Sequence, residues 1–195
     1  KRIIFLAAFL LVGVQLFAQT PVYLTKAYKP VESELYDAYS SHEIQGGDTW
    51  NNCFVLNVIN NHCGRAVFNL GGKYETISFI MGPDKGHGKY DPNIVQIHAD
   101  GKRIFEQVVR DADLAQHYTL NISGVDKLEF SLFRPQCEVA FCEVALWTKG
   151  QTPHDLRGKH DPEVKSRMLF RDIVPYRRNY SSAYTDADNA RHTLV

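Results

Sequence analysis

The glycine-rich stretch from Gly82 to Tyr90 holds the residue types best suited to bind a small polar ligand. A phosphate-binding loop would need four residues between two glycines, then Lys, then Ser or Thr, so that backbone amides cradle the phosphates. Here five residues separate Gly82 from Gly88, and Tyr90 takes the hydroxyl position. We therefore interpret the stretch as a loop between two strands that offers Asp84, His87 and Tyr90 to a polar ligand. A purely structural glycine-rich loop is the alternative.

Two further side chains are candidate ligand contacts. Trp50 lies in residues 46–52, a segment rich in Gly, Asp and Asn. An aromatic ring can stack on the C–H face of a sugar, while Asp and Asn bind its hydroxyls. A Trp that caps the hydrophobic core is the alternative. Arg134 follows the end of an alternating strand and is the last candidate. These residues indicate sugar recognition.

Catalysis finds no recognisable sequence support. The chain has no Gly-x-Ser-x-Gly nucleophile elbow. A small glycoside hydrolase, which needs two carboxylates facing one cleft, stays as a lesser alternative, since sequence does not reveal that separation. We predict a protein that is not an enzyme and needs no cofactor. A structural calcium ion, held by loop oxygens, is compatible with this prediction.

Residues 1–18 have the features of a secretory signal peptide. A basic pair, Lys1-Arg2, precedes an apolar run that extends to Val12, and a small residue, Ala18, marks a cleavage site. The run is shorter than the roughly 20 residues of a membrane-spanning helix, although a membrane anchor or a buried helix is the alternative. We predict an exported protein, periplasmic or extracellular, whose mature chain starts near Gln19 and has no stable membrane span.

Export changes how the four cysteines are interpreted, because disulfides persist in oxidising compartments. Four cysteines allow three pairings, and proximity in the sequence favours Cys53–Cys63 together with Cys137–Cys142. A zinc site that uses His62 beside Cys63 is an alternative, but the paired Cys-x₂-Cys spacing of structural zinc sites is missing. Free buried thiols are the remaining alternative.

Alternating apolar and polar residues predict β-strands between Val22 and Trp147. Alternation places one set of side chains in a core and the other in water. Asp100-Gly101 is a strong hairpin signal, and Gly71-Gly72 marks another turn. The predicted strands span residues 53–58, 66–70, 74–81, 94–99, 103–109, 118–123, 127–133 and 139–147. Many short strands predict an all-β, antiparallel sandwich of the jelly-roll type.

Charge is unevenly distributed along the chain. The whole sequence has 22 Lys+Arg and 22 Asp+Glu, which argues against a nucleic-acid partner, since such proteins usually carry a basic surplus. The predicted domain, residues 19–148, has an acidic excess, whereas residues 149–195 have nine Lys/Arg against six Asp/Glu. We predict that this basic extension is mostly irregular, with a partly helical segment at Asp161–Ile173.

The strand pattern resembles the NPCBM family of carbohydrate-binding modules. The family has a strand, a Leu-x-Gly-x-Tyr turn, and a second strand that ends in Gly before an Asp. The matching positions here are Leu70, Gly72, Tyr74, Phe79, Gly82 and Asp84. The hairpin Val95–Phe105, the turn within Leu120–Phe130 and the closing strand Val139–Trp147 are similar to later family segments in order and spacing.

This resemblance implies a jelly roll of the galactose-binding-like type, found in secreted bacterial proteins beside glycosidase domains. The end of the signal segment, Phe17-Ala18-Gln19, resembles those of Bacteroidetes. We therefore predict an exported module that binds a glycan through Trp50, Asp84 and the neighbouring candidate contacts. The alternative is a protein-interaction module of an exported or cell-envelope assembly, in which no sugar is bound.

Overall fold

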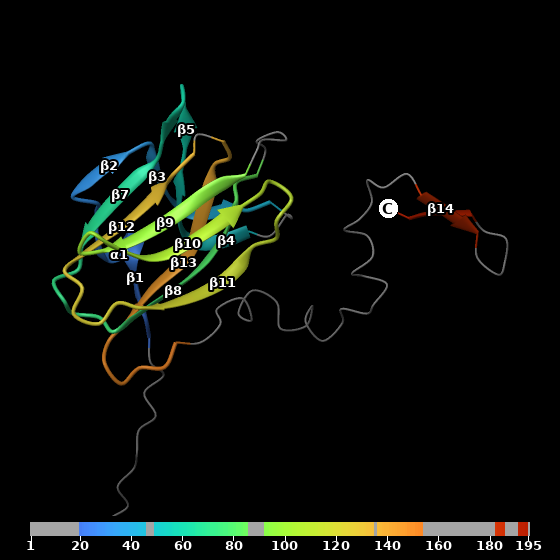
Figure 1. Cartoon of the computed structure of the whole chain (residues 1–195). Helices are drawn as coiled ribbons and strands as arrows, with labels where there is room; N and C mark the ends of the chain where they lie inside the picture. The colour runs from blue at the N-terminus through green and yellow to red at the C-terminus, as the bar shows by residue number, and fades with distance from the viewer. Residues whose placement is uncertain are drawn as a thin grey trace, which may run out of the picture. The chain divides into compact units, whose positions relative to one another are not determined.

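The protein folds into two facing antiparallel β-sheets (Figure 1). The computed structural model describes residues 20–45, 49–85, 92–134 and 136–153, and the backbone of strands 182–185 and 191–194. Sheet A has the order β11 (Gln116–Asn121), β8 (Thr76–Pro83), β13 (Val139–Trp147), β4 (Thr49–Leu56) and β3 (Tyr36–Glu43), and β1 (Val22–Tyr23) pairs with β13. Sheet B has the order β10 (Lys102–Val109), β9 (Asn93–Ala99), β12 (Lys127–Leu132), β7 (Arg65–Asn69) and β2 (Glu32–Glu34). The helix α1 (Leu24–Ala27) and a short hairpin of β5 (Val58–Ile59) and β6 (His62–Cys63) complete this unit.

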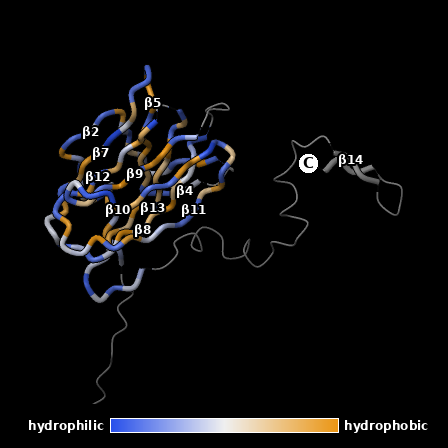
Figure 2. The backbone as a smooth tube through the Cα atoms, in the orientation of Figure 1, coloured by the Kyte–Doolittle hydropathy of each residue, from blue (hydrophilic) through white to orange (hydrophobic). Residues whose placement is uncertain are grey.

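The main core lies between the two sheets and is rich in aromatic rings. Phe54 and Phe141, from neighbouring strands of sheet A, stack with ring centroids 4.8 Å apart. Phe130 of sheet B meets both of them edge-on, at 5.2 Å. Figure 2 shows hydrophobic segments running through the strands, with hydrophilic turns between them. Each fully buried Phe stabilises the fold by about 1.5–3 kcal/mol, so the sandwich is a firm support for its loops.

The predicted strand alternation and hairpin are confirmed. Residues of β9 alternate between buried and half-buried along the whole strand. Asp100 and Gly101 have φ values of 48° and 81°, and they connect β9 to β10 with Ala99 opposite Lys102. Positive φ at both central residues is what a two-residue hairpin turn requires, and Asp and Gly tolerate it best. The all-β sandwich predicted from the sequence is therefore correct.

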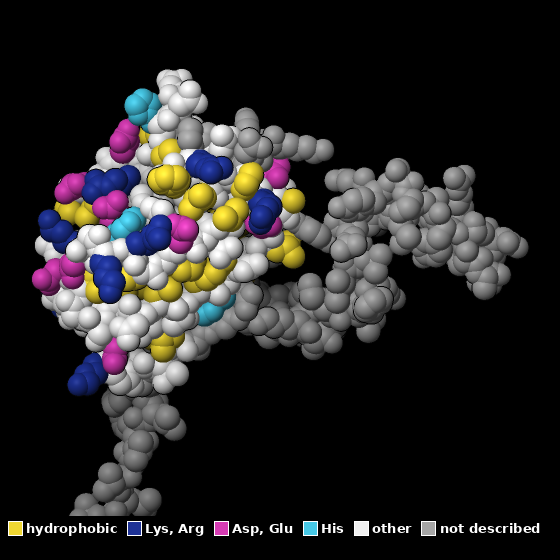
Figure 3. Space-filling model, in the orientation of Figure 1, with side chains coloured by type: hydrophobic (Ala, Val, Ile, Leu, Met, Phe, Trp, Pro, Cys, Tyr) yellow, Lys and Arg dark blue, Asp and Glu magenta, His cyan; other side chains and the backbone are white. Residues whose placement is uncertain are grey.

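The outer side of sheet B carries charged side chains of both signs (Figure 3). Arg65 of β7 forms ion pairs with Glu32 of β2 and Glu129 of β12, at 2.9 and 2.8 Å. Figure 3 shows Lys and Arg side chains interspersed with Asp and Glu on this side of the molecule. Charges of both signs alternate here, as is usual for the solvated face of a sandwich.

The outer side of sheet A is covered by the hairpin of β3 and β4. β4 pairs with β13 only from Phe54 to Leu56. Beyond that, Asn52 has a positive φ of 52° and the hairpin leaves the ladder. Its far end pairs with β8, where Ile44 bridges Asp84 and the Gln45 N–H donates to the Pro83 carbonyl at 3.0 Å. The hairpin therefore crosses the face of sheet A.

A second, smaller core forms between this hairpin and sheet A. Its members are Ile44, Trp50, Cys53, Val55, Ile80, Ala140 and Cys142, with Ala115 packed against them. Gly82 makes the close approach feasible, because a Cβ there would lie 2.7 Å from Ile44 Cγ2 and 3.1 Å from Ala115 Cα. Because β13 is covered on both faces, all nine of its residues are buried.

The disulfide differs from the sequence prediction. Cys53 of β4 is bonded to Cys142 of β13, with their Cα atoms 4.0 Å apart, while Cys63 and Cys137 are free. The predicted pairs Cys53–Cys63 and Cys137–Cys142 are therefore wrong. Cys63 and Cys137 pack against the main core, whereas Cys53 and Cys142 face the second core on the other side of sheet A. Proximity along the chain does not bring together side chains that point to opposite faces.

The C-terminal part of the chain, from His154 to Val195, forms a second unit. In it, β14 (Ser182–Thr185) pairs with β15 (Arg191–Leu194) in an antiparallel hairpin, which the sequence did not predict. The helix predicted at Asp161–Ile173 and the signal peptide of residues 1–18 lie outside the described residues. Within the described part, α1 has only four residues, and no helix there is long and apolar enough to cross a membrane.

Candidate functional site

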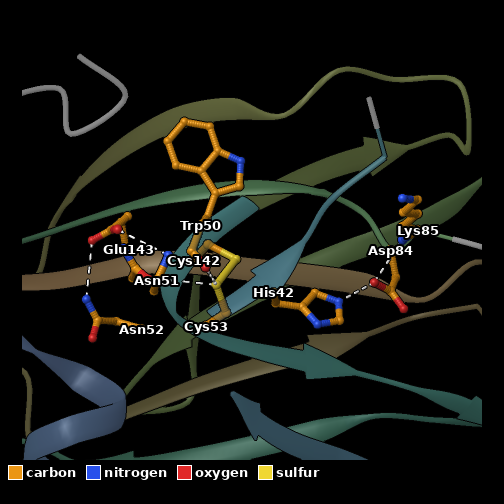
Figure 4. The surroundings of a disulfide bond; sticks show 9 residues. All are labelled: His42, Trp50, Asn51, Asn52, Cys53, Asp84, Lys85, Cys142 and Glu143. Atoms are coloured by element: carbon orange, nitrogen blue, oxygen red, sulfur yellow. Dashed lines mark hydrogen bonds and ion pairs between the residues drawn. A yellow bond between two sulfur atoms is a disulfide. The ribbon is translucent and has the colours of Figure 1, made fainter. Parts of the chain in front are cut away.

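The tip of the β3–β4 hairpin and the end of β8 bring polar side chains together (Figure 4). His42 Nε2 pairs with Asp84 Oδ1, which also accepts the Lys85 backbone N–H at 2.8 Å. Lys85 in turn forms an ion pair with Glu43. The Asp84 backbone N–H donates to the Glu138 carbonyl at 3.0 Å, which ties the site to the start of β13. Asp84 is therefore fixed from three directions.

Tyr39 presents an aromatic ring beside this group. The Tyr39 and His42 ring centroids lie 4.6 Å apart, with an angle of 33° between the planes. Tyr39 retains 39% of its surface exposed. Burial raises the pKa of the Tyr39 phenol, and the negative charges of Asp37, Asp84 and Glu138 raise it further. The ring is thus in contact with His42 and partly open to solvent.

Trp50 lies opposite His42 in the hairpin ladder but has a different environment. It is only 5% exposed and belongs to the second core. Figure 4 shows its indole beside the Cys53–Cys142 bond. A ring buried to this extent holds the hairpin on the sheet and leaves little surface for a sugar to stack on.

The other predicted contacts are distributed differently. Arg134 is exposed in the turn after β12, where its backbone N–H donates to Asn93 Oδ1 at 3.1 Å. Asn93 is fully buried and also donates to the Cys137 carbonyl at 3.0 Å. His87 and Tyr90 lie outside the described residues. Of the predicted contacts, the structure brings Trp50 and Asp84 to one place, on either side of His42.

The sequence did not identify Tyr39 and His42 as site residues. The sequence of β3 is Tyr-Asp-Ala-Tyr-Ser-Ser-His-Glu, which has little apolar alternation. In the structure only Tyr36, His42 and Glu43 of this strand are half-buried, and the other residues are exposed. The contact between His42 and Asp84 spans 42 residues of sequence. It depends on the hairpin crossing sheet A, and no local pattern reports that crossing.

A buried carboxylate, Glu143, lies near the disulfide but is engaged by hydrogen-bond donors. It accepts the Asn51 backbone N–H at 3.2 Å and Asn52 Nδ2 at 3.3 Å. It also accepts a hydrogen bond from the Tyr23 hydroxyl. The pKa of Tyr23 is raised mainly by burial, with a smaller contribution from the negative charge of Glu143. Among the described residues, no cluster of three His, Cys, Asp or Glu side chains could hold a metal ion. The donors around Glu143 suit a structural carboxylate better than a calcium ligand.

The comparisons with known proteins agree with this fold. Residues 61–147 match the NPCBM/NEW2 domain family. The structure is similar to a CBM51 module of GH95 from Clostridium perfringens, solved in complex with methyl-galactose (TM-score 0.53, 13% identity, 65% of this chain and 99% of that chain). It is also similar to the M60 catalytic domain of ZmpB with two CBM51 domains from the same organism (TM-score 0.55, 16% identity, 89% of this chain and 23% of that chain). A third similar structure contains tandem CBM51 modules of a family 98 glycoside hydrolase from Streptococcus pneumoniae (TM-score 0.53, 13% identity, 88% of this chain and 58% of that chain).

At these identities the likeness to solved structures concerns the fold. The chain matches no curated protein. The sandwich, its strand order and the family match agree with the resemblance seen in the sequence over Gly71-Gly72, Asp100-Gly101 and the closing strand. Residues 61–147 of the β-sandwich therefore match the NPCBM/NEW2 domain family, and the sandwich has the fold of solved CBM51 modules.

Proposed function

We propose that this protein is an exported, non-catalytic module that binds a carbohydrate. The observation that carries the proposal is the NPCBM/NEW2 domain on a sandwich that covers 99% of a CBM51 module solved with methyl-galactose. Because a fold does not determine a ligand, the proposal also depends on the polar and aromatic surface at the hairpin tip. The Cys53–Cys142 disulfide supports export, since such bonds persist in oxidising compartments.

The proposed mechanism is recognition without bond cleavage. Hydroxyl groups of a sugar would exchange hydrogen bonds with water for hydrogen bonds with Asp84 and with neighbouring polar groups. Asp84 precedes His87 and Tyr90 in the chain, so we propose that this run supplies polar contacts. Arg134 remains a proposed contact from the turn after β12. Trp50, buried under the hairpin, acts by holding that hairpin in place.

A glycan-array screen of the purified full chain tests this function. We expect binding to a limited set of glycans, with no release of reducing ends when those glycans are incubated with the protein. Absence of binding at high protein concentration would contradict the proposal and favour a protein-interaction module. Cleavage of the bound glycan would contradict the non-catalytic part alone.

A further inference from the structure

Five large apolar or aromatic side chains are exposed in the described part of the chain: Val31, Tyr39, Ile59, Leu114 and Phe133. A sugar-binding ring needs an open face together with hydrogen-bonding groups at its edge. Among these five, Tyr39 stacks against a histidine that pairs with a carboxylate. Its position is thus unlike that of an isolated exposed apolar residue, which is common on protein surfaces.

The Tyr39 ring is held in place before any ligand arrives. Tyr39 lies directly opposite Cys53 in the β3–β4 ladder, and Cys53 is covalently bonded to Cys142 of the sheet. His42 supports the ring from one side and is itself paired with Asp84. A ring fixed in this way loses little conformational freedom when it binds, which is how preorganised sites gain affinity.

The charges around this ring are predominantly negative. Asp37 lies two residues before Tyr39 in the regular β3 ladder, so both side chains leave the strand on the same face. Asp84 pairs with His42, the residue whose ring contacts Tyr39. Lys85, the cation next to Asp84 in the chain, forms an ion pair with Glu43. These carboxylates repel an anionic ligand, while their oxygens can accept hydrogen bonds from the hydroxyl groups of a neutral one.

We infer that Tyr39 is the stacking platform of this module, and that the carboxylates around it restrict the ligands to glycans without carboxylate or sulfate groups. The inference rests on the proposed function and adds to it a site and a ligand class. The open face of the ring covers the C–H face of a neutral sugar, and Asp84 accepts a hydrogen bond from one of its hydroxyls. An anionic sugar in the same place would be repelled by the carboxylates of Asp37 and Asp84.

The platform is tested by comparing three variants on neutral glycans from the array. Tyr39→Ala removes the ring and should weaken binding at least tenfold, whereas Tyr39→Phe keeps the ring and should bind within a few-fold of the wild type. Phe133→Ala, which removes an exposed ring elsewhere (62% exposed), is the matched control and should bind normally. Circular dichroism and thermal unfolding confirm that each variant is folded. If folded Tyr39→Ala binds as the wild type does, the platform is overturned while the proposed function survives.

The charge restriction is tested with matched ligand pairs. N-acetyllactosamine is compared with its 3′-sulfated and sialylated forms, and galactan with polygalacturonan, at low and at high salt. We expect each anionic ligand to bind at least tenfold more weakly than its neutral partner. This difference in affinity should decrease as salt screens the charges. The difference in affinity should also be smaller in the Asp37→Asn variant than in the wild type. Equal binding of both members of a pair would overturn the restriction, and binding of no glycan by the wild type would overturn the proposed function and this inference together.

Discussion

Gly82 decides whether the β3–β4 hairpin can lie on sheet A. A methyl group at this position would meet Ile44 Cγ2 at 2.7 Å and Ala115 Cα at 3.1 Å. We predict that Gly82→Ala lowers the free energy of unfolding by about 1–3 kcal/mol, the usual cost of overpacking, as measured by urea denaturation. In a double-mutant cycle with Ile44→Ala the two costs should be less than additive, because the smaller side chain relieves the contact. Strictly additive costs would show that the clash is absent.

Tyr36 provides a prediction about alkaline pH. Burial raises the pKa of its phenol to about 12, with a smaller contribution from Asp37. Because the raised pKa belongs to the folded state, its stabilising contribution is complete below pH 10 and is lost as the pH rises towards 12. The free energy of unfolding should therefore fall over this range, and more gently in Tyr36→Phe. An identical slope in wild type and Tyr36→Phe would contradict this assignment.

At the residue scale the sequence identified one half of the candidate site. Asp84 could be predicted because a glycine-rich run with polar side chains between two strands is a recognisable loop pattern. Tyr39 and His42 could not, since their role depends on a contact 42 residues away. Trp50 is the converse case: the sequence left a stacking ring and a core-capping ring both open, and the structure buries the ring to 5% exposure. The difference lies in a crossing hairpin that no local pattern encodes.

At the element scale, the Cys53–Cys142 disulfide joins the hairpin to the sheet where the β4–β13 ladder ends. It closes a loop of 89 residues, for which chain entropy predicts roughly 4–5 kcal/mol of stabilisation. We predict that replacing both cysteines by Ser lowers the free energy of unfolding by about 2–5 kcal/mol. Cys63→Ser, at a partly exposed free thiol, is the control and should have little effect.

The pairing itself can be read by peptide mapping without reduction. A linked peptide pair that contains Cys53 and Cys142 is expected, and a peptide linking Cys53 to Cys63 would contradict the structure.

Strand positions and the Asp100-Gly101 hairpin could be predicted from the sequence, because the strand period and the turn residues are local signals. The disulfide partner could not, because it depends on which face of sheet A each cysteine occupies.

At the scale of the whole molecule, the sandwich and its family were within reach of the sequence. The order and spacing of several weak patterns, from Leu70 to Trp147, together indicated a resemblance to the NPCBM family, and the match over residues 61–147 confirms that resemblance. The hairpin of β14 and β15 was not predicted, since four-residue strands in a polar segment give little periodic signal. The crossing of β3 over sheet A is where we propose that the ligand binds.

The most direct test of the account is a crystal structure of the protein with the neutral glycan that binds best on the array. We predict a sugar ring stacked on the open face of Tyr39, with a hydroxyl within hydrogen-bonding distance of Asp84. A sugar bound at another surface would contradict the assigned platform. Crystals that hold no sugar at saturating concentration, from protein that also fails to bind in solution, would contradict carbohydrate recognition itself.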